Sequence, residues 1–217
     1  MIKYVFFDMD GTLIDSEEYY IDGTYDMLLN NGFKGNKKDI NYIIGTTLDV
    51  TYNYLVKLLD NRFTYQEIKI KNEEYFKENP INVNDRVYTD TVKGIMTLKN
   101  KGFKIAICSS STRKEIEKFI NILKLNDYID YYISGEELKH SKPEPDIYLT
   151  TLDYFKASKN EAIILEDSYS GIKAGKNAGI YTVARKDIKF SIDQSEANYI
   201  VLNMNEFIKH IEDKKGY

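Results

Sequence analysis

Residues 2–13 read IKYVFFDMDGTL, in which a run of apolar residues ends abruptly at Asp8 and Asp10. An apolar run of this length without alternating polar positions is typical of a strand that is buried on both faces of a sheet. Comparable runs recur along the chain and also end in polar or small residues; they cover residues 104–108, 162–165 and 180–184, with weaker runs at 128–133 and 199–202. The sequence therefore predicts a parallel sheet.

Helical periodicity separates these runs from about residue 85 onward. Apolar residues follow the i, i+3, i+4, i+7 rule at Ile116, Phe119, Ile120 and Leu123, and a similar stripe begins at Ile147. Alternating strands and helices favour right-handed crossovers with helices on both faces of the sheet. We therefore predict the α/β class with a doubly wound parallel sheet.

The long interval after the first strand contains helical patterns and no strand pattern. Residues 19–29 and 65–76 are helical candidates, and a third helix is indicated by an apolar stripe at Leu48, Tyr52, Leu55, Leu58 and Leu59. We interpret this interval as an inserted helical cap.

The expected boundaries place the α/β core at residues 1–14 and 85–217 and the helical cap at residues 15–84. The connections fall near Leu13–Ser16 and near Pro80–Arg86, where a proline and two asparagines interrupt the helical pattern. These connections are the candidate hinges of a mobile cap.

The charge balance and the lengths of the apolar runs argue against nucleic acid and membrane as partners. The chain of 217 residues has 34 acidic and 30 basic side chains, a formal charge of −4 at pH 7, so we expect no nucleic-acid partner. No stretch reaches the roughly 18 uncharged apolar residues of a membrane span, and Asp8 and Asp10 interrupt the first apolar run before a signal sequence could form. We therefore expect a cytoplasmic protein without membrane contact, either a monomer or a weak dimer.

The chain has few residues for soft-metal chemistry. Cys108 is its only cysteine and His140 and His210 its only histidines, which excludes an internal disulfide and leaves zinc without ligands. Cys108 lies within an apolar run and is expected to be a buried strand residue. Any metal should therefore have oxygen ligands, as magnesium does.

Carboxylates follow two of the predicted strands. Ligands of open parallel sheets bind beyond the carboxyl ends of the strands, so these residues should share one site. They would repel one another with only one nearby cation, Lys142, to balance them, and a bound Mg²⁺ would remove this repulsion. The expected metal-binding residues are Asp8, Asp10, Glu166 and Asp167.

A site with a hard cation, an ammonium group and hydroxyl donors suits the oxygens of a phosphoryl group. Asp8 could attack phosphorus in line and form an aspartyl-phosphate. Asp10 would then protonate the leaving alkoxide and later deprotonate water. We expect Asp8, Asp10 and Lys142 to be the catalytic residues.

Small and hydroxyl-bearing residues beside these strand ends are candidates for binding the phosphate. Gly11 permits a tight turn and, with Thr12, close approach of backbone donors. Ser109 and Ser110 follow another strand and precede a helix. Ser109 could alternatively be an ordinary helix N-cap.

These residues resemble, in order and spacing, the four motifs of the haloacid dehalogenase superfamily of phosphohydrolases. The matching segments are Asp8-Met9-Asp10-Gly11-Thr12-Leu13, Ser109, Lys142 in Ser141-Lys142-Pro143, and Glu166-Asp167-Ser168. The resemblance implies a Rossmann-like core with an inserted cap, and it implies that Ser109 and Lys142 bind phosphate. It also implies Mg²⁺ bound by Asp8, by Asp167 and by Asp10 through its backbone, with Glu166 assisting less directly.

The position of the cap resembles the subgroup that includes phosphoglycolate phosphatases, sugar-phosphate phosphatases and β-phosphoglucomutases. The mutase pattern has a histidine where this chain has Tyr20, and an arginine in a cap loop that is absent from residues 45–48. We therefore predict a Mg²⁺-dependent phosphatase for a small phosphorylated metabolite, such as a sugar phosphate. The alternative is a β-phosphoglucomutase-type transfer within a sugar phosphate.

Substrate choice should depend on cap residues, because the four motifs contact only phosphate and metal. The candidates are Ser16, Tyr20, Thr24, Gly45 and Thr46. Each of them is equally compatible with an ordinary place in a helix or loop.

Three other interpretations fit less well. An EF-hand calcium loop needs glycine at its sixth position, whereas Gly11 is fourth and follows a strand. A receiver-type phospho-acceptor module is shorter and has no acid/base residue two positions after its aspartate. A dehalogenase lacks the second aspartate, since a halide needs no protonation, so Asp10 favours a phosphatase.

Overall fold

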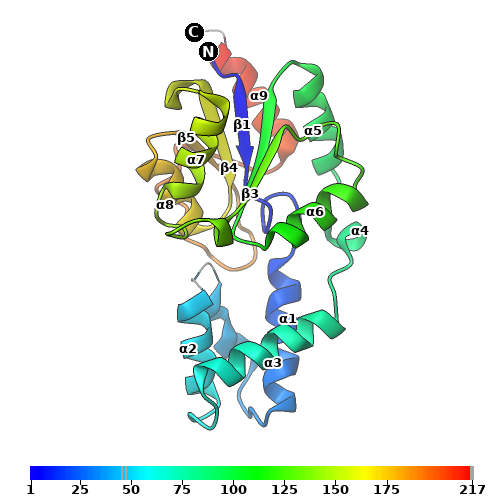
Figure 1. Ribbon diagram of the computed structural model, residues 1–217, viewed down its shortest axis with the longest axis vertical. Helices are drawn as coiled ribbons and strands as arrows, with labels where there is room; N and C mark the ends of the chain where they lie inside the picture. Colours follow the sequence, from blue (N-terminus) through cyan, green and yellow to red (C-terminus); the bar gives the residue numbers. More distant parts are fainter. Residues whose placement is uncertain (45, 47, 216–217) are drawn as a thin grey trace. The chain divides into compact units, whose positions relative to one another are not determined.

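The computed structural model describes residues 1–44, 46 and 48–215. Within them, a parallel sheet has the strand order β3-β2-β1-β4-β5-β6 (Figure 1). This order confirms the predicted doubly wound α/β class, and it reverses between β1 and β4, where such sheets bind ligands. The strands are β1 (Tyr4–Phe7), β2 (Lys104–Ser109), β3 (Tyr131–Ser134), β4 (Ala162–Glu166), β5 (Tyr181–Arg185) and β6 (Tyr199–Val201).

Helices connect these strands and cover both faces of the sheet. α7 and α8 pack on one face, while α5 and α9 pack together on the other. The helices of this part are α4 (Val83–Arg86), α5 (Thr91–Asn100), α6 (Arg113–Ile122), α7 (Asp146–Phe155), α8 (Tyr169–Asn177) and α9 (Met204–Lys215), with 3₁₀ turns η2 (Gly135–Glu137) and η3 (Lys159–Glu161).

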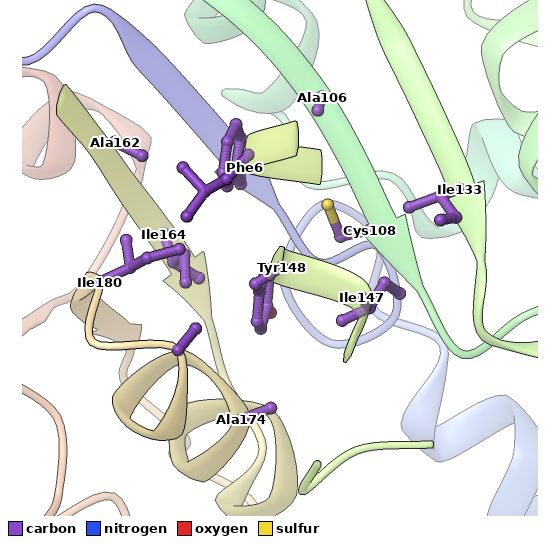
Figure 2. Packing of buried hydrophobic residues seen from close by; sticks show 12 residues of the cluster. Phe6, Ala106, Cys108, Ile133, Ile147, Tyr148, Ala162, Ile164, Ala174 and Ile180 are labelled. Atoms are coloured by element: carbon purple, nitrogen blue, oxygen red, sulfur yellow. The ribbon is translucent and has the colours of Figure 1, made fainter. Parts of the chain in front are cut away.

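Successive residues of β1 pack on opposite faces of the sheet. Phe6 lies in a cluster with Cys108, Ile164 and Tyr148, between the strands and helices α7 and α8 (Figure 2). Phe7 contacts Phe207 of α9, with ring centroids 5.9 Å apart. Each fully buried side chain of this size contributes about 1.5–3 kcal/mol, which explains why an unbroken apolar run forms this strand.

The chain separates into two compact units, one of residues 1–14 and 83–217 and one of residues 15–82. The helical unit ends two residues before the boundary expected from the sequence. Val83, which opens α4, is buried and belongs to the sheet unit. The helical unit contains α1 (Glu17–Asn30), the 3₁₀ helix η1 (Lys37–Ile43), α2 (Leu48–Leu58) and α3 (Tyr65–Glu78).

The helical unit has a hydrophobic core of its own, formed by Ile21, Met27, Leu28, Ile40, Tyr52, Leu55, Leu59 and Ile68. The predicted apolar stripe that starts at Leu48 is confirmed at Tyr52 and Leu55, which are buried, and is wrong at Leu48. Leu48 opens the first turn of α2 and is 64% exposed, because the unit's core begins one turn later at Tyr52. α3 begins after Thr64, whose hydroxyl accepts from the backbone of Glu67 while the Glu67 carboxylate accepts from the backbone of Thr64.

The search for membrane spans found no candidate, since no helix in the described part of the chain combines the required length with sufficient apolar character.

Candidate active site

The loop after β1 is a tight turn in which backbone groups bond to one another. Leu13 donates its N–H to the Met9 carbonyl at 2.8 Å, and Gly11 donates to the Ile14 carbonyl at 2.8 Å. Gly11 has a φ of +75°, which L side chains rarely adopt. The sequence predicts that the Gly11 N–H faces a phosphate. In the structure, this N–H donates to a carbonyl of its own loop.

Lys142 is a buried cation at the centre of the site. Its Nζ donates to Asp8 Oδ1 at 2.6 Å, to Glu166 Oε1 at 2.7 Å and to the Cys108 carbonyl at 3.0 Å. These three acceptors belong to the ends of β1, β4 and β2. The ammonium group has three hydrogens, so one side chain joins the ends of three neighbouring strands.

Burial and neighbouring charges shift the pKa values of Asp8 and Lys142. Removal from water raises the pKa of Asp8 well above its ordinary value, with a further increase from Glu166 and Asp10, although Lys142 acts in the opposite direction. Burial alone would lower the pKa of Lys142, but Asp8 and Glu166 hold it well above its usual range. Lys142 therefore remains an ammonium ion, and a further cation close to Asp8 would favour the ionised form of that carboxyl group.

Glu166 is completely buried and bonded through both carboxylate oxygens. Oε1 accepts from Lys142 and, at 3.2 Å, from the Tyr148 hydroxyl. Oε2 accepts from the backbone of Asp167 at 2.9 Å and from the backbone and hydroxyl of Ser168 at 3.1 Å. A Cβ at Gly171 would lie 1.6 Å from Glu166, so the glycine leaves room for this carboxylate.

Asp167 faces the loop after β1. Its Oδ1 accepts from the Thr12 hydroxyl at 2.8 Å, and both residues are buried. A Cβ on Gly11 would lie only 2.0 Å from Asp167 Oδ2. Gly11 is thus needed for the close approach of this carboxylate, and the Thr12 hydroxyl holds Asp167 in place.

The acidic residues form a group that fits a hard divalent cation. Asp8, Glu166 and Asp167 each offer one carboxylate oxygen, and these atoms lie within 4.8 Å of one another. When all three carboxyl groups are ionised, the group and Lys142 together have a formal charge of −2 in a buried place, which is costly without a cation. Asp8 and Asp167 are better suited as direct ligands than Glu166, because Glu166 already has hydrogen bonds at both oxygens.

Asp10 is held by hydroxyl groups at and just after the end of β2. The Ser111 hydroxyl donates to Asp10 Oδ2 in a short hydrogen bond, and the Ser109 hydroxyl approaches the same oxygen at 3.4 Å. The sequence interpretation did not single out Ser111, although it is the third serine at this strand end. Ser110, expected to bind substrate, has an exposed side chain.

The N-cap of α6 is Thr112 and not Ser109. The Thr112 hydroxyl accepts from the backbone of Glu115 at 3.3 Å. Ser109 instead accepts from the backbone of Ser111 at 3.0 Å, which fixes the turn between β2 and α6. The alternative interpretation of Ser109 as an ordinary helix cap is therefore wrong.

The substrate-binding candidates of the helical unit have local partners. Tyr20 packs edge-to-face against Tyr19 and Phe76, with centroid distances of 5.1 and 5.3 Å. The Thr46 hydroxyl bonds to the Ile43 carbonyl at 2.8 Å and to the Thr51 hydroxyl at 2.9 Å. Gly45 lies outside the described residues.

Known proteins resemble this chain over most of its length. Residues 5–185 match the family model described as haloacid dehalogenase-like hydrolase. A phosphoglycolate phosphatase of Aquifex aeolicus is 31% identical over 183 residues, 83% of each chain. A phosphorylated carbohydrates phosphatase of Thermotoga maritima is 30% identical over 187 residues, 82% of each chain.

The fold has counterparts among solved structures. A β-phosphoglucomutase from Clostridium difficile superposes with a TM-score of 0.80 at 21% identity, covering 99% of this chain and 97% of the other. Likeness at this level of identity concerns the fold alone. The family match, the two relatives and the order of the four motifs together show that the chain belongs to the haloacid dehalogenase-like hydrolases.

Proposed function

We propose that this protein is a Mg²⁺-dependent phosphatase that hydrolyses a small phosphorylated metabolite through an aspartyl-phosphate on Asp8. The observation that carries the proposal is the group formed by Asp8, Lys142, Glu166 and Asp167 at the carboxyl ends of β1 and β4. The phosphatase names of two relatives that are at least 30% identical support the same reaction class.

In the first half of the reaction, a carboxylate oxygen of Asp8 attacks phosphorus and the bond to the ester oxygen breaks. Lys142 bonds to Asp8 and fixes its orientation. Asp10, in its acid form, gives its proton to the departing alkoxide, which leaves as an alcohol. The Ser109 hydroxyl, 3.4 Å from Asp10 Oδ2, is our candidate for donating to an oxygen of the transferring phosphoryl group.

In the second half, water attacks the phosphorus of the aspartyl-phosphate. Asp10, now a carboxylate, accepts the proton of this water, the bond to Asp8 breaks, and inorganic phosphate leaves. Both enzyme carboxyl groups thereby return to their initial protonation states. The Ser111 hydroxyl, which donates to Asp10, holds that carboxyl group in place through both halves.

Asp8, Asp167 and the backbone carbonyl of Asp10 would hold the Mg²⁺. When bound, this ion supplies positive charge that neutralises Asp8 and a phosphate oxygen in the same place. Thr12 orients Asp167 through its hydroxyl, and the Glu166 carboxylate fixes the backbone of Asp167 by accepting from its N–H.

The helical unit, residues 15–82, is our candidate for recognition of the rest of the metabolite. Tyr20 stands where the mutase pattern has a histidine that controls the acid/base aspartate, and its ring packs on Tyr19 and Phe76. This difference supports hydrolysis over transfer between positions of one sugar.

The test is phosphate release from a panel of 2-phosphoglycolate, hexose and pentose phosphates and inorganic pyrophosphate, each with Mg²⁺ and with a chelator. β-Glucose 1-phosphate is included with a coupled assay for glucose 6-phosphate. Mg²⁺-dependent release from one or more phosphomonoesters is the expected result. Formation of glucose 6-phosphate with little phosphate release would show a mutase and contradict the proposal. Phosphate release that a chelator does not affect would contradict the Mg²⁺ dependence.

A further inference from the structure

Two buried residues outside the four motifs join the loops that hold the acidic site. Arg185 ends β5, and Gln194 belongs to the loop that follows. Arg185 is 8% exposed and Gln194 is 7% exposed, although both are polar. Buried polar side chains need partners, so their contacts indicate what they stabilise.

Gln194 bonds to the backbone of the candidate metal ligand. Its Nε2 donates to the Asp167 carbonyl at 2.6 Å and to the Arg185 carbonyl at 2.7 Å. Its Oε1 accepts from the backbone of Asp187 at 3.1 Å. Two carbonyls require donors and one N–H requires an acceptor, which is the pattern of a primary amide.

The loop that carries Gln194 folds around Asp187. The Asp187 carboxylate accepts from the backbone of Lys189 at 2.9 Å, of Phe190 at 3.0 Å and of Ile192 at 2.8 Å. These bonds fix the turn of the chain between Asp187 and Ile192, which precedes Gln194.

Arg185 bonds to the other loop of the site. Its Nη1 donates to the Thr12 carbonyl at 3.2 Å, and Nη2 lies 3.4 Å from Asp90 Oδ1. The guanidinium also stacks on Tyr88, 3.7 Å from the ring centroid. Tyr88 and Thr91 bond to the carbonyls of Gly11 and Leu13 at 3.3 and 2.8 Å, so three consecutive carbonyls are fixed.

These contacts form a closed ring of hydrogen bonds. Thr12 donates to the Asp167 carboxylate, Gln194 joins Asp167 to Arg185, and Arg185 returns to Thr12. We propose that Arg185 and Gln194 are positioning residues that hold Asp167 and the loop after β1 in the geometry needed for Mg²⁺ binding. This inference rests on the proposed function, since it assumes that Asp167 is a Mg²⁺ ligand.

The test is calorimetric titration of the metal-free full chain with Mg²⁺ alone, which needs no turnover. Gln194→Met keeps the length of the side chain and removes its donors. We expect it to raise the Mg²⁺ dissociation constant about 10-fold, as loss of an outer partner of a metal ligand generally does. Arg185→Lys keeps the charge and loses the planar fork, so we expect a smaller rise of about 3-fold.

Thr182→Val is the matched control. It removes a buried hydroxyl on the same strand that bonds to the Ile180 carbonyl at 3.1 Å, outside the ring. Thermal unfolding of each variant without metal, followed by circular dichroism, separates a loss of stability from a loss of Mg²⁺ affinity. The proposal expects Thr182→Val to bind Mg²⁺ as the wild type does.

Wild-type affinity in folded Gln194→Met would overturn the inference and leave the proposed phosphatase intact. If Gln194→Met does not fold, Arg185→Lys decides in the same way. Asp167→Asn should abolish binding, and unchanged binding in that variant would overturn both the inference and the place of Asp167 among the Mg²⁺ ligands of the proposed function. A wild-type protein that binds no Mg²⁺ would overturn both the inference and the metal dependence of the proposed function.

Discussion

The two aspartates that follow β1 are only two residues apart, yet they lie in different surroundings. Asp8 is 7% exposed and bonds to a buried ammonium group. Asp10 is less buried and accepts from serine hydroxyls at and just after the end of β2. The Asp8 side (Asp8, Lys142, Glu166) is therefore held by charge, and the Asp10 side (Asp10, Ser109, Ser111) by neutral hydrogen bonds.

This difference matches the two roles proposed. A nucleophile must be fixed in one direction, which strong charge-assisted bonds achieve. An acid/base group must give up and regain a proton, and hydroxyls can reorient as both donors and acceptors while this happens. The comparison predicts that damage to the Asp8 side affects stability and activity together, whereas damage to the Asp10 side affects mainly activity.

The largest effect is expected for Lys142→Met, which leaves Asp8 and Glu166 buried without their cation. Removing one partner of a buried pair costs about 3–5 kcal/mol of the free energy of unfolding, and loss of this donor should lower kcat by about 10²–10³-fold. Urea unfolding and phosphate release measure the two effects.

Lys3→Met is the control, because Lys3 pairs with Glu161 at the same 2.6 Å as Lys142 with Asp8, but on the surface. Exposed pairs contribute little, so both stability and activity should be nearly unchanged. Equal losses of stability in the two variants would contradict the account of the Asp8 side.

Gly11→Ala should weaken Mg²⁺ binding, because the new Cβ would lie 2.0 Å from Asp167 Oδ2. We expect the Mg²⁺ concentration for half-maximal activity to rise about 10-fold. Gly102→Ala is a close match in backbone terms, with φ of +86° and nothing within 4 Å of the added atom. Both variants should lose about 1–2 kcal/mol of stability from the backbone conformation, and only the first should change its Mg²⁺ requirement.

Ser111→Ala removes the short hydrogen bond to Asp10 without disturbing a buried charge. Loss of one hydrogen bond of about 1 kcal/mol predicts a fall in kcat of about 5-fold with little change in stability. Thr97→Val, which removes an exposed hydroxyl bonded to the Lys93 carbonyl at 2.8 Å, is the control. If Ser111→Ala and Thr97→Val have the same kcat, the proposed role of Ser111 in holding Asp10 is wrong.

The smallest effect concerns Cys108, whose carbonyl bonds to Lys142 while its thiol lies in the core. Burial raises the pKa of this thiol to about 12. The thiolate, which is the reactive form, is therefore suppressed at every pH well below that value. A thiol reagent at pH 8 should leave the folded protein unmodified and react on unfolding; rapid labelling of the native protein would contradict this burial.

The fold could be predicted because its signals are local. An unbroken apolar run that stops at Asp8, at Ser109 or at Glu166 marks both a buried strand and its carboxyl end. The predicted class, the sheet and the resemblance to haloacid dehalogenase-like hydrolases are confirmed. The exposed Leu48 shows the limit of such patterns, since a helical stripe does not reveal where a core begins.

Partners of the site residues depend on tertiary contacts that no local pattern contains. Arg185 and Gln194 lie more than 150 residues from Thr12, and no local pattern marks them as members of one hydrogen-bonded ring with it. The bond from the Thr12 hydroxyl to Asp167 is one such contact, because it forms only once β1 and β4 lie side by side. Ser110 and Ser111 are neighbouring serines in the sequence, and only the folded turn shows that Ser111 is the one that bonds to Asp10.

The central claim is that Asp8 accepts the phosphoryl group. Asp10→Asn lacks both the acid of the first half and the base that activates water. A phosphate ester whose leaving group departs without a proton, such as p-nitrophenyl phosphate, should therefore phosphorylate this variant in the presence of Mg²⁺ and accumulate the intermediate. After an acid quench, peptide mass spectrometry should find phosphate on Asp8, and Asp8→Asn treated in the same way should carry none. Phosphate on another residue, or rapid phosphate release by Asp8→Asn, would contradict the account.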